Sequence, residues 1–192
     1  MKPIDLTLSA VFAVLTSLGA WIFLPIPFSP VPVTLQSLFV VLSGASLGSK
    51  RGALSQIIYL LIGLVGFPVF SRGNSGPGVF VGPTGGYLVG FVLGAYVTGR
   101  LVETRPTPSL IWAFASTLSG VGVIYVTGVG QLWFWLRGSL TSVLLAGVIP
   151  FLPGDVVKAA VAAYISTRNQ VKAILSKSEQ HNLSSGHRSE DS

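Results

Sequence analysis

The stretch Leu6–Leu24, LTLSAVFAVLTSLGAWIFL, contains no charged side chain. An apolar run of about 20 residues is the length that crosses a bilayer as an α-helix. A single lysine, Lys2, stands before the run beside Asp5, and no clear small-residue cleavage site follows it. We therefore expect a retained membrane-spanning helix rather than a secretory signal that is removed.

Five further apolar runs follow, separated by segments rich in proline and glycine at 25–32, 67–86 and 128–153. The runs are Val33–Leu47, Gly52–Phe67, Thr84–Val102, Ser109–Gly128 and Pro153–Arg168. Apolar residues make up 50% of the chain, charged residues only 9%, and the mean hydropathy is +0.71. These values lie outside the range of soluble globular domains. We expect an all-α integral membrane protein with about six transmembrane helices in residues 1–170.

The positions of the cations predict the orientation, because lysine and arginine are retained on the cytoplasmic side of a membrane. Arg72 and Arg137 fall on the outer side, and Lys158 lies within the last run. The other cations fall on the inner side: Lys2, Lys50, Arg51, Arg100, Arg105, Arg168, Lys172, Lys177 and Arg188. We expect a multi-pass protein of the cell membrane with both termini in the cytoplasm.

The end of the chain, 171–192, is serine-rich, charged and nearly free of aliphatic residues. Such a segment has too little apolar surface to fold on its own, so we expect a disordered cytoplasmic tail. Both histidines, His181 and His187, lie in this tail, and cysteine is absent. The membrane body therefore lacks the common metal ligands and the common general base, and we expect no metal, no cofactor and no enzymatic activity. Because the cations stand at the ends of apolar runs, we also expect no nucleic-acid binding.

Ionisable residues inside the last apolar run are the first candidates for a site. They lie in the segment PFLPGDVVK, which covers 150–158 and contains Asp155 and Lys158. On a helix these two residues share one face, and Pro153 suits a helix that begins part-way into the membrane. The pair is either a structural ion pair or the polar part of a ligand pocket, since intramembrane charges normally line a pathway.

Two loop segments add further candidates. FSRGNSGPGVFVGPTGGY, covering 70–87, brings glycines that allow close backbone approach together with the amide of Asn74. PVPVTLQ, covering 30–36, gives a rigid, extended start to the second run. The first segment could simply be a tight external turn, and the second could equally be a lid or a plain helix start. Further along, Trp133, Phe134 and Trp135 cluster beyond the fifth run, where we expect them to anchor the protein in the headgroup layer.

The first run also has a face of small residues, in which Ser9, Ala13 and Ser17 recur every four residues. Small side chains let a second helix approach closely. The spacing predicts a docking face, but it leaves open whether the second helix belongs to this chain or to a partner.

With these segments in view, the chain resembles the BioY family, the biotin-capturing membrane subunits of energy-coupling-factor (ECF) transporters. The likeness covers about 6–168 and rests on VPVTLQ (31–36), GPTGGY (82–87) and PFLPGDVVK (150–158), which occur in the family's order. The resemblance implies a six-helix fold with an outward-opening pocket for biotin. The substrate-binding residues that it implies are Asp155, Lys158, Asn74, Gln36, Tyr87 and Arg72.

The resemblance implies partners as well: a membrane coupling protein, which would dock on Ser9, Ala13 and Ser17, and two cytoplasmic ATPases. Two departures from the family pattern are visible, because Ser9 stands where an alanine is common and Arg72-Gly-Asn74 interrupts the glycine loop. The group that binds the biotin carboxylate is left open among Lys158, Arg72 and backbone amides of the external loops.

Two rival functions remain for comparison. A capture subunit for another vitamin, riboflavin or thiamine, would share the scaffold. An intramembrane protease is suggested by Gly73-Asn-Ser75-Gly76, but the membrane body lacks a histidine base and has only one carboxylate, Asp155, within a span. The sequence also lacks a Gly-x4-Gly-Lys-Ser/Thr phosphate-binding loop, so energy from ATP would have to come from partner proteins.

Overall fold

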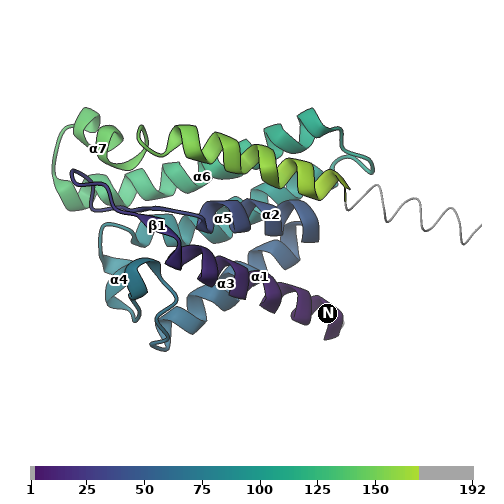
Figure 1. Cartoon of the computed structure of the whole chain (residues 1–192), viewed down its shortest axis with the longest axis horizontal. Coiled ribbons are helices and arrows are strands. Elements are labelled where there is room, and N and C mark those ends of the chain that lie inside the picture. Colours follow the sequence, from purple (N-terminus) through teal and green to yellow (C-terminus); the bar gives the residue numbers. More distant parts are fainter. Residues whose placement is uncertain (1–2, 169–192) are drawn as a thin grey trace, which may run out of the picture.

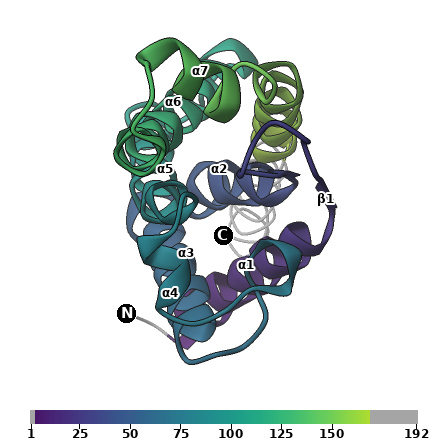
Figure 2. The same ribbon diagram turned by 90° about the vertical axis from the view of Figure 1, so that its left-hand side faces the viewer.

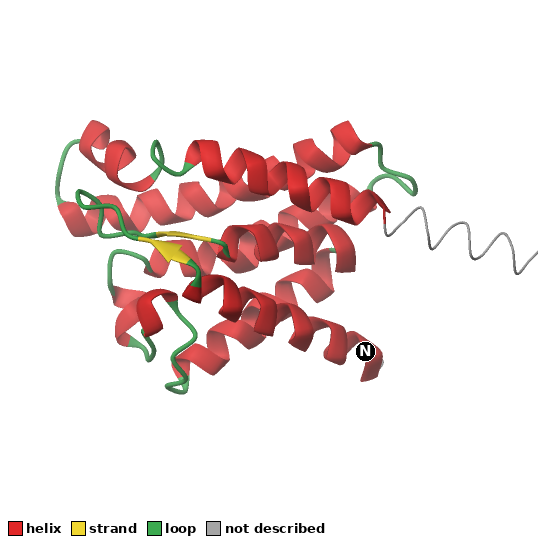
Figure 3. Ribbon diagram, viewed as in Figure 1, coloured by secondary structure: helices red, strands yellow, loops and turns green. Residues whose placement is uncertain are grey.

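The computed structural model describes residues 3–168, which form a bundle of helices with a single short two-stranded ribbon (Figures 1 and 3). The predicted tail, 171–192, lies outside the described residues. The elements in chain order are α1 (Pro3–Trp21), β1 (Phe23–Leu24), β2 (Val33–Thr34), α2 (Gln36–Leu47), α3 (Ser49–Leu64), the short 3₁₀ turn η1 (Ser71–Gly73), α4 (Gly78–Val81), α5 (Gly85–Glu103), α6 (Leu110–Leu136), α7 (Leu140–Gly147) and a last helix, Leu152–Arg168.

Each of the six predicted runs corresponds to a helix, which confirms the all-helical membrane fold. Three helices, α1, α5 and α6, are long and apolar enough to cross a bilayer. A fourth span results if α7 and the last helix, which meet at a 50° bend, are counted together. α2 and α3, with 12 and 16 residues, are shorter than the usual span.

The predicted end of the fifth run at Gly128 is wrong, because α6 continues to Leu136. Gly128 packs against the ring of Tyr87, where a side chain would not fit, so this glycine serves close packing rather than helix termination. The helix ends at Arg137, whose backbone is left-handed (φ 49°). Trp133, Phe134 and Trp135 therefore form the last turn of α6, with their side chains exposed, and α7 occupies part of the proline- and glycine-rich segment 128–153.

The tightest packing in the bundle joins α5 to α6 through glycines. Gly86, Gly90 and Gly94, spaced four residues apart, lie against the backbone of α6 around Thr127 and Ile124. Glycines in this spacing allow two membrane helices to approach closely enough for backbone contact. α5 and α6 consequently form a closely packed pair within the bundle.

One end of the bundle carries both ends of the described chain (Figure 1). Here Asp5 of α1 forms an ion pair with Arg51 of α3, with 2.9 Å between oxygen and nitrogen. The carboxylate of Glu103, at the end of α5, accepts hydrogen bonds from the backbone N–H (2.7 Å) and hydroxyl (2.8 Å) of Ser49. A carboxylate suits this place because the N-terminus of α3 is the positive end of its dipole.

The opposite end of the bundle is closed by loops. Viewed from this end, α6, α7 and the last helix lie on one side, α1 and α3 on the other, and α2 and α5 lie between them (Figure 2). The β1–β2 hairpin crosses toward α7, where the Ser29 hydroxyl donates to the carbonyl oxygen of Ala146. The Tyr87 hydroxyl donates to the neighbouring carbonyl of Gly147 at 2.8 Å.

A substitution at the α5–α6 contact tests this packing. Gly90→Ala should destabilise the protein, because the added methyl would meet the Thr127 hydroxyl and the backbone of Ile124. Overpacking of this kind costs about 1–3 kcal/mol. Gly122→Ala is the matched control, since Gly122 lies in α6 with no atom within 4 Å of the added position. Thermal unfolding in detergent measures both, and an unchanged midpoint for Gly90→Ala would contradict the packing.

Candidate ligand-binding site

A pocket opens at the loop-covered end of the bundle, opposite the chain termini. Its walls come from the hairpin, α2, the α3–α4 connection, α5, α6 and the start of the last helix. The lining residues are Val31, Pro32, Thr34, Gln36, Ser37, Ser71, Thr84, Tyr87, Leu88, Phe91, Ile124, Tyr125, Phe151, Asp155 and Lys158. Four of the predicted substrate-binding residues, Gln36, Tyr87, Asp155 and Lys158, are thus brought together from α2, α5 and the start of the last helix.

The last helix places its two ionisable residues at the pocket because it begins inside the bundle, after the bend at α7. Asp155 and Lys158 are three residues apart, and the Lys158 ammonium lies 2.8 Å from one Asp155 oxygen. Both side chains are nearly buried, at 9% and 11% exposed. The ammonium also donates to the backbone carbonyl of Thr34, so it links the last helix to the hairpin. The two interpretations of this pair, structural and ligand-facing, are therefore compatible.

Two hydroxyl groups complete the environment of the Asp155 carboxylate. The Ser37 hydroxyl of α2 donates to one oxygen at 2.8 Å, and the Tyr125 hydroxyl of α6 donates to the other at 2.5 Å. A buried charge is tolerated when it is paired and hydrogen-bonded, and this carboxylate has three donors. The four residues form a cluster, here called the carboxylate cluster: Ser37, Tyr125, Asp155 and Lys158.

Sequence reasoning missed Ser37 and Tyr125. Ser37 directly follows the motif that ends at Gln36, and it lies in the first turn of α2. Its place beside this motif could have indicated a pocket residue. Tyr125 stands alone in an apolar run, and nothing in the spacing indicates that it faces the one intramembrane carboxylate. Its role follows only from the packing of α6 on α5, which fixes the face that α6 turns toward the pocket.

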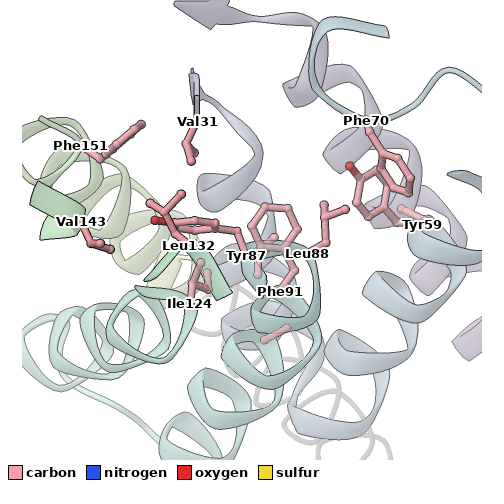
Figure 4. Close-up of a cluster of buried hydrophobic side chains, with 13 residues drawn as sticks. Val31, Tyr59, Phe70, Tyr87, Leu88, Phe91, Ile124, Leu132, Val143 and Phe151 are labelled. Atoms are coloured by element: carbon pink, nitrogen blue, oxygen red, sulfur yellow. The ribbon is translucent and has the colours of Figure 1, made fainter. Parts of the chain in front are cut away.

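An aromatic and aliphatic wall faces the carboxylate cluster. Val31 and Phe151 lie at one side of this wall, with Tyr87, Leu88 and Phe91 next to them, and Tyr59 and Phe70 lie beyond these in the buried core (Figure 4). The Gln36 amide donates to the Tyr59 hydroxyl, whose ring packs edge-on against Phe70 at 5.5 Å between centroids. The pocket therefore combines apolar walls with a few fixed polar groups, as small-molecule sites usually do.

The glycine loop reaches the pocket through Ser71, whereas Arg72 and Asn74 are exposed and do not line it. The Asn74 amide donates to the carbonyl of Ser71 at 2.9 Å, which closes a tight turn. Arg72 occupies the left-handed region at φ 61°, a conformation that is uncommon for residues other than glycine. Contact of Arg72 and Asn74 with a ligand stays a prediction, and it requires their side chains to turn toward the pocket.

The small-residue face of α1 is used within this chain. Ser9 and Ala13 are fully buried, and the Ser9 hydroxyl donates to the Arg51 carbonyl of α3 at 3.1 Å. Ser17 is partly buried, and its hydroxyl donates to the carbonyl of Ala13. The face thus packs α1 on α3, and in this arrangement Ser9 and Ala13 have no free surface for a partner protein.

The fold and the pocket define an all-helical, multi-pass membrane protein with a small-molecule site at one end. A solved structure described as the S-component for biotin from an ECF-type ABC transporter has the same fold, with a TM-score of 0.81, 28% identity, and coverage of 88% of this chain and 94% of that chain.

The chain belongs to the BioY family, whose model matches residues 1–176. The biotin transporter BioY of Thermotoga maritima is 44% identical over 160 residues, which cover 83% of this chain and 92% of that protein. The biotin transporter BioY of Rhizobium etli is 38% identical over 173 residues, with 86% and 92% covered. A probable biotin transporter BioY of Pyrococcus horikoshii is 39% identical over 172 residues, with 88% and 98% covered.

We expect the carboxylate cluster to stabilise the protein when no ligand is bound. Tyr125→Phe removes one donor from a buried carboxylate, and a hydrogen bond to a charged group contributes about 1.5–3 kcal/mol. We expect a lower midpoint of thermal unfolding in detergent. Tyr96→Phe is the matched control, because Tyr96 is exposed and has no side-chain hydrogen bond within residues 3–168. Equal midpoints for the two variants would show that Tyr125 does not support Asp155.

Proposed function

We propose that this chain is the substrate-specific membrane component of an ECF-type transporter and binds biotin for uptake into the cell. The observation that carries the proposal is the carboxylate cluster at the wall of an otherwise apolar pocket, in a chain of the BioY family. The aliphatic and aromatic wall suits the carbon skeleton of biotin, and the cluster suits its ureido ring, which has two N–H donors and one carbonyl acceptor.

The polar groups of the cluster already pair with one another. The Asp155 carboxylate accepts three hydrogen bonds, and the Lys158 ammonium donates to Asp155, Thr34 and Ser37. A carboxylate has about four acceptor positions, so Asp155 can still accept an N–H group of the ureido ring. Binding through Lys158 would instead exchange one of its present hydrogen bonds for one to the ligand. Such an exchange adds little to the binding free energy, but it disfavours ligands that lack the matching polar group.

The pocket has to open for a ligand of this size. Its cavity is about 70 Å³ with the side chains as they stand, well below the roughly 300–1,000 Å³ of typical ligand sites. Of its walls, the hairpin lies outside the helices: it is held by the β1–β2 ribbon, by the Ser29 bond to Ala146, by the Lys158 bond to Thr34 and by the buried side chain of Val31. We therefore assign ligand admission to the hairpin, as a lid between α1 and α2.

The valerate carboxylate of biotin needs a cationic or N–H donor. Lys158 is partly neutralised by Asp155, so it offers little net positive charge to an anion. Arg72 is a free cation at the pocket end, because the three carboxylates within residues 3–168 pair with Arg51, Arg100 and Lys158. We assign the carboxylate to Arg72 and to backbone amides of its loop, with Asn74 closing the turn that presents them.

Uptake against a gradient needs energy that this chain does not provide. Its sequence lacks the phosphate-binding loop of ATPases, so we propose a membrane coupling protein and two cytoplasmic ATPase subunits as partners. We also propose that the chain lies in the cell membrane with its termini in the cytoplasm. The support is the distribution of cations, since Lys50, Arg51, Arg100 and Arg105 gather at the end that holds the termini.

A capture subunit for riboflavin or thiamine is the alternative. The carboxylate cluster favours a ring with N–H donors, such as the ureido ring, over a fused aromatic system. Calorimetric titration of the purified chain with biotin, riboflavin and thiamine tests the proposed function, and tight binding of either aromatic vitamin with none of biotin would overturn it.

Removing both charges of the pair separates a structural role from a binding role. Asp155→Asn with Lys158→Met leaves no uncompensated charge, so the fold should persist with a similar unfolding midpoint. Biotin affinity should fall roughly a hundredfold or more, because a charged hydrogen bond is lost and polar ligand atoms stay unpaired. Calorimetry on the wild type, both single variants and the double variant measures this. Tight biotin binding by a well-folded double variant would remove the pair from the site.

The assignment of Arg72 is tested with a ligand that lacks the negative charge. Arg72→Gln should weaken biotin binding about tenfold or more and leave the binding of biotinamide nearly unchanged, since only the carboxylate needs the cation. Arg137→Gln is the matched control, because Arg137 is also exposed, also left-handed and at the same end of the bundle. If the affinities for biotin and biotinamide fell equally, Arg72 would serve to maintain the conformation of the loop rather than to bind the carboxylate.

A further inference from the structure

A second concave surface lies at the end of the bundle that holds the chain termini, far along α6 from the biotin pocket. It is a groove between the first turns of α6 and the last turns of the last helix, with a volume of about 280 Å³. Its lining is almost entirely apolar: Leu110, Ile111, Phe114, Ala160 and Tyr164. Ile111 is 81% exposed, so within residues 3–168 no side chain covers this surface.

One end of this groove carries a positive charge. The guanidinium of Arg168 lies over the ring of Tyr164, 5.3 Å from its centroid. The carboxylates in the described part of the chain, Asp5, Glu103 and Asp155, pair with other cations, so none of them neutralises Arg168. Arg105 lies over Trp112 in the same first turn of α6, at 4.0 Å, and is likewise without a carboxylate partner there.

The hydroxyl of Tyr164 adds a neutral polar group beside this charge. It makes no hydrogen bond to any residue from 3 to 168, and its ring forms part of the groove wall. The groove is therefore amphipathic: hydrocarbon walls between two membrane helices, then a phenol, then a guanidinium where the helix ends. This order of surfaces matches the order of an acyl chain, a glycerol ester and a phosphate in a lipid.

We propose that this groove binds one anionic phospholipid, with an acyl chain between α6 and the last helix and the headgroup phosphate on Arg168. Charge complementarity decides the class of lipid, because a guanidinium forms paired hydrogen bonds with phosphate and is attracted most where no headgroup cation offsets the phosphate charge. The two helices that form the groove also carry Tyr125 and Asp155, but the groove lies at the opposite end of the bundle from these residues. The proposal does not depend on the identity of the pocket's ligand.

Lipid titration of the purified chain, followed by native mass spectrometry, tests the proposal with phosphatidylglycerol and phosphatidylcholine as probes. The wild type should bind phosphatidylglycerol more tightly. Arg168→Gln should reduce this preference about fivefold, the effect of one cation near a charged headgroup. Ala160→Phe fills the groove from an exposed position and should reduce binding of both lipids.

Arg137→Gln is the matched control, since Arg137 is an exposed arginine beside exposed aromatic residues at the opposite end of α6. It should leave both lipid affinities unchanged, and biotin titration of all variants should give wild-type values if the chain is folded. Wild-type lipid binding by Arg168→Gln and Ala160→Phe would overturn the proposal. So would a result in which Ala160→Phe abolishes binding of a purified coupling protein and leaves lipid binding intact, because the groove would then be a protein interface.

Discussion

The buried ion pair between Asp155 and Lys158 is the interaction on which the pocket end of this protein depends. A lone charge in this apolar setting would be strongly unfavourable, so the structure surrounds the carboxylate with an ammonium and two hydroxyl groups. Each donor comes from a different place: Ser37 from α2, Tyr125 from α6, and Lys158 from the last helix itself. Satisfying one carboxylate thereby fixes three helices relative to one another, and the Lys158 bond to Thr34 adds the hairpin.

The ion pair can perform this role because the last helix begins inside the bundle. The bend between α7 and the last helix brings Pro153 and Gly154 to the level of the pocket, so Asp155 falls in the first turn. An unbroken span would place those positions at the membrane surface or bury them against a neighbouring helix. α7 ends at Gly147 and the last helix begins at Leu152, so Pro153 lies in the first helical turn, where proline is tolerated because its missing N–H would have no helical partner.

The sequence predicts the number and approximate extent of the main helices, because a bilayer requires long apolar runs whatever the tertiary contacts are. It also singles out Asp155 and Lys158 as candidates, since charges in such runs are rare, and the structure places both at the pocket. It mispredicts the end of α6, because Gly128 is a packing glycine whose partner, the Tyr87 ring, lies far away in the sequence. The sequence does not predict the roles of Ser37 and Tyr125 for the same reason: the hydrogen-bond partner of each hydroxyl, Asp155, lies on another helix. The small face of α1 was recognised, but its location against α3 rather than on a free surface depends on tertiary packing.

The contrast between two kinds of contact explains how such a pocket can be both specific and accessible. α5 and α6 meet backbone to backbone through Gly86, Gly90 and Gly94, and a shift of either helix would break many contacts at once. The hairpin contains no helix and makes no contact of this backbone-to-backbone kind, and its bond from Ser29 to Ala146 lies beside the bond from Tyr87 of α5 to Gly147. In the proposed opening of the hairpin, Tyr87, Tyr125 and Phe91 would stay in place, because α5 and α6 carry them. Because Thr34 belongs to the hairpin, the proposed opening would also break the Lys158 bond to Thr34 and leave one N–H of the ammonium available to a ligand.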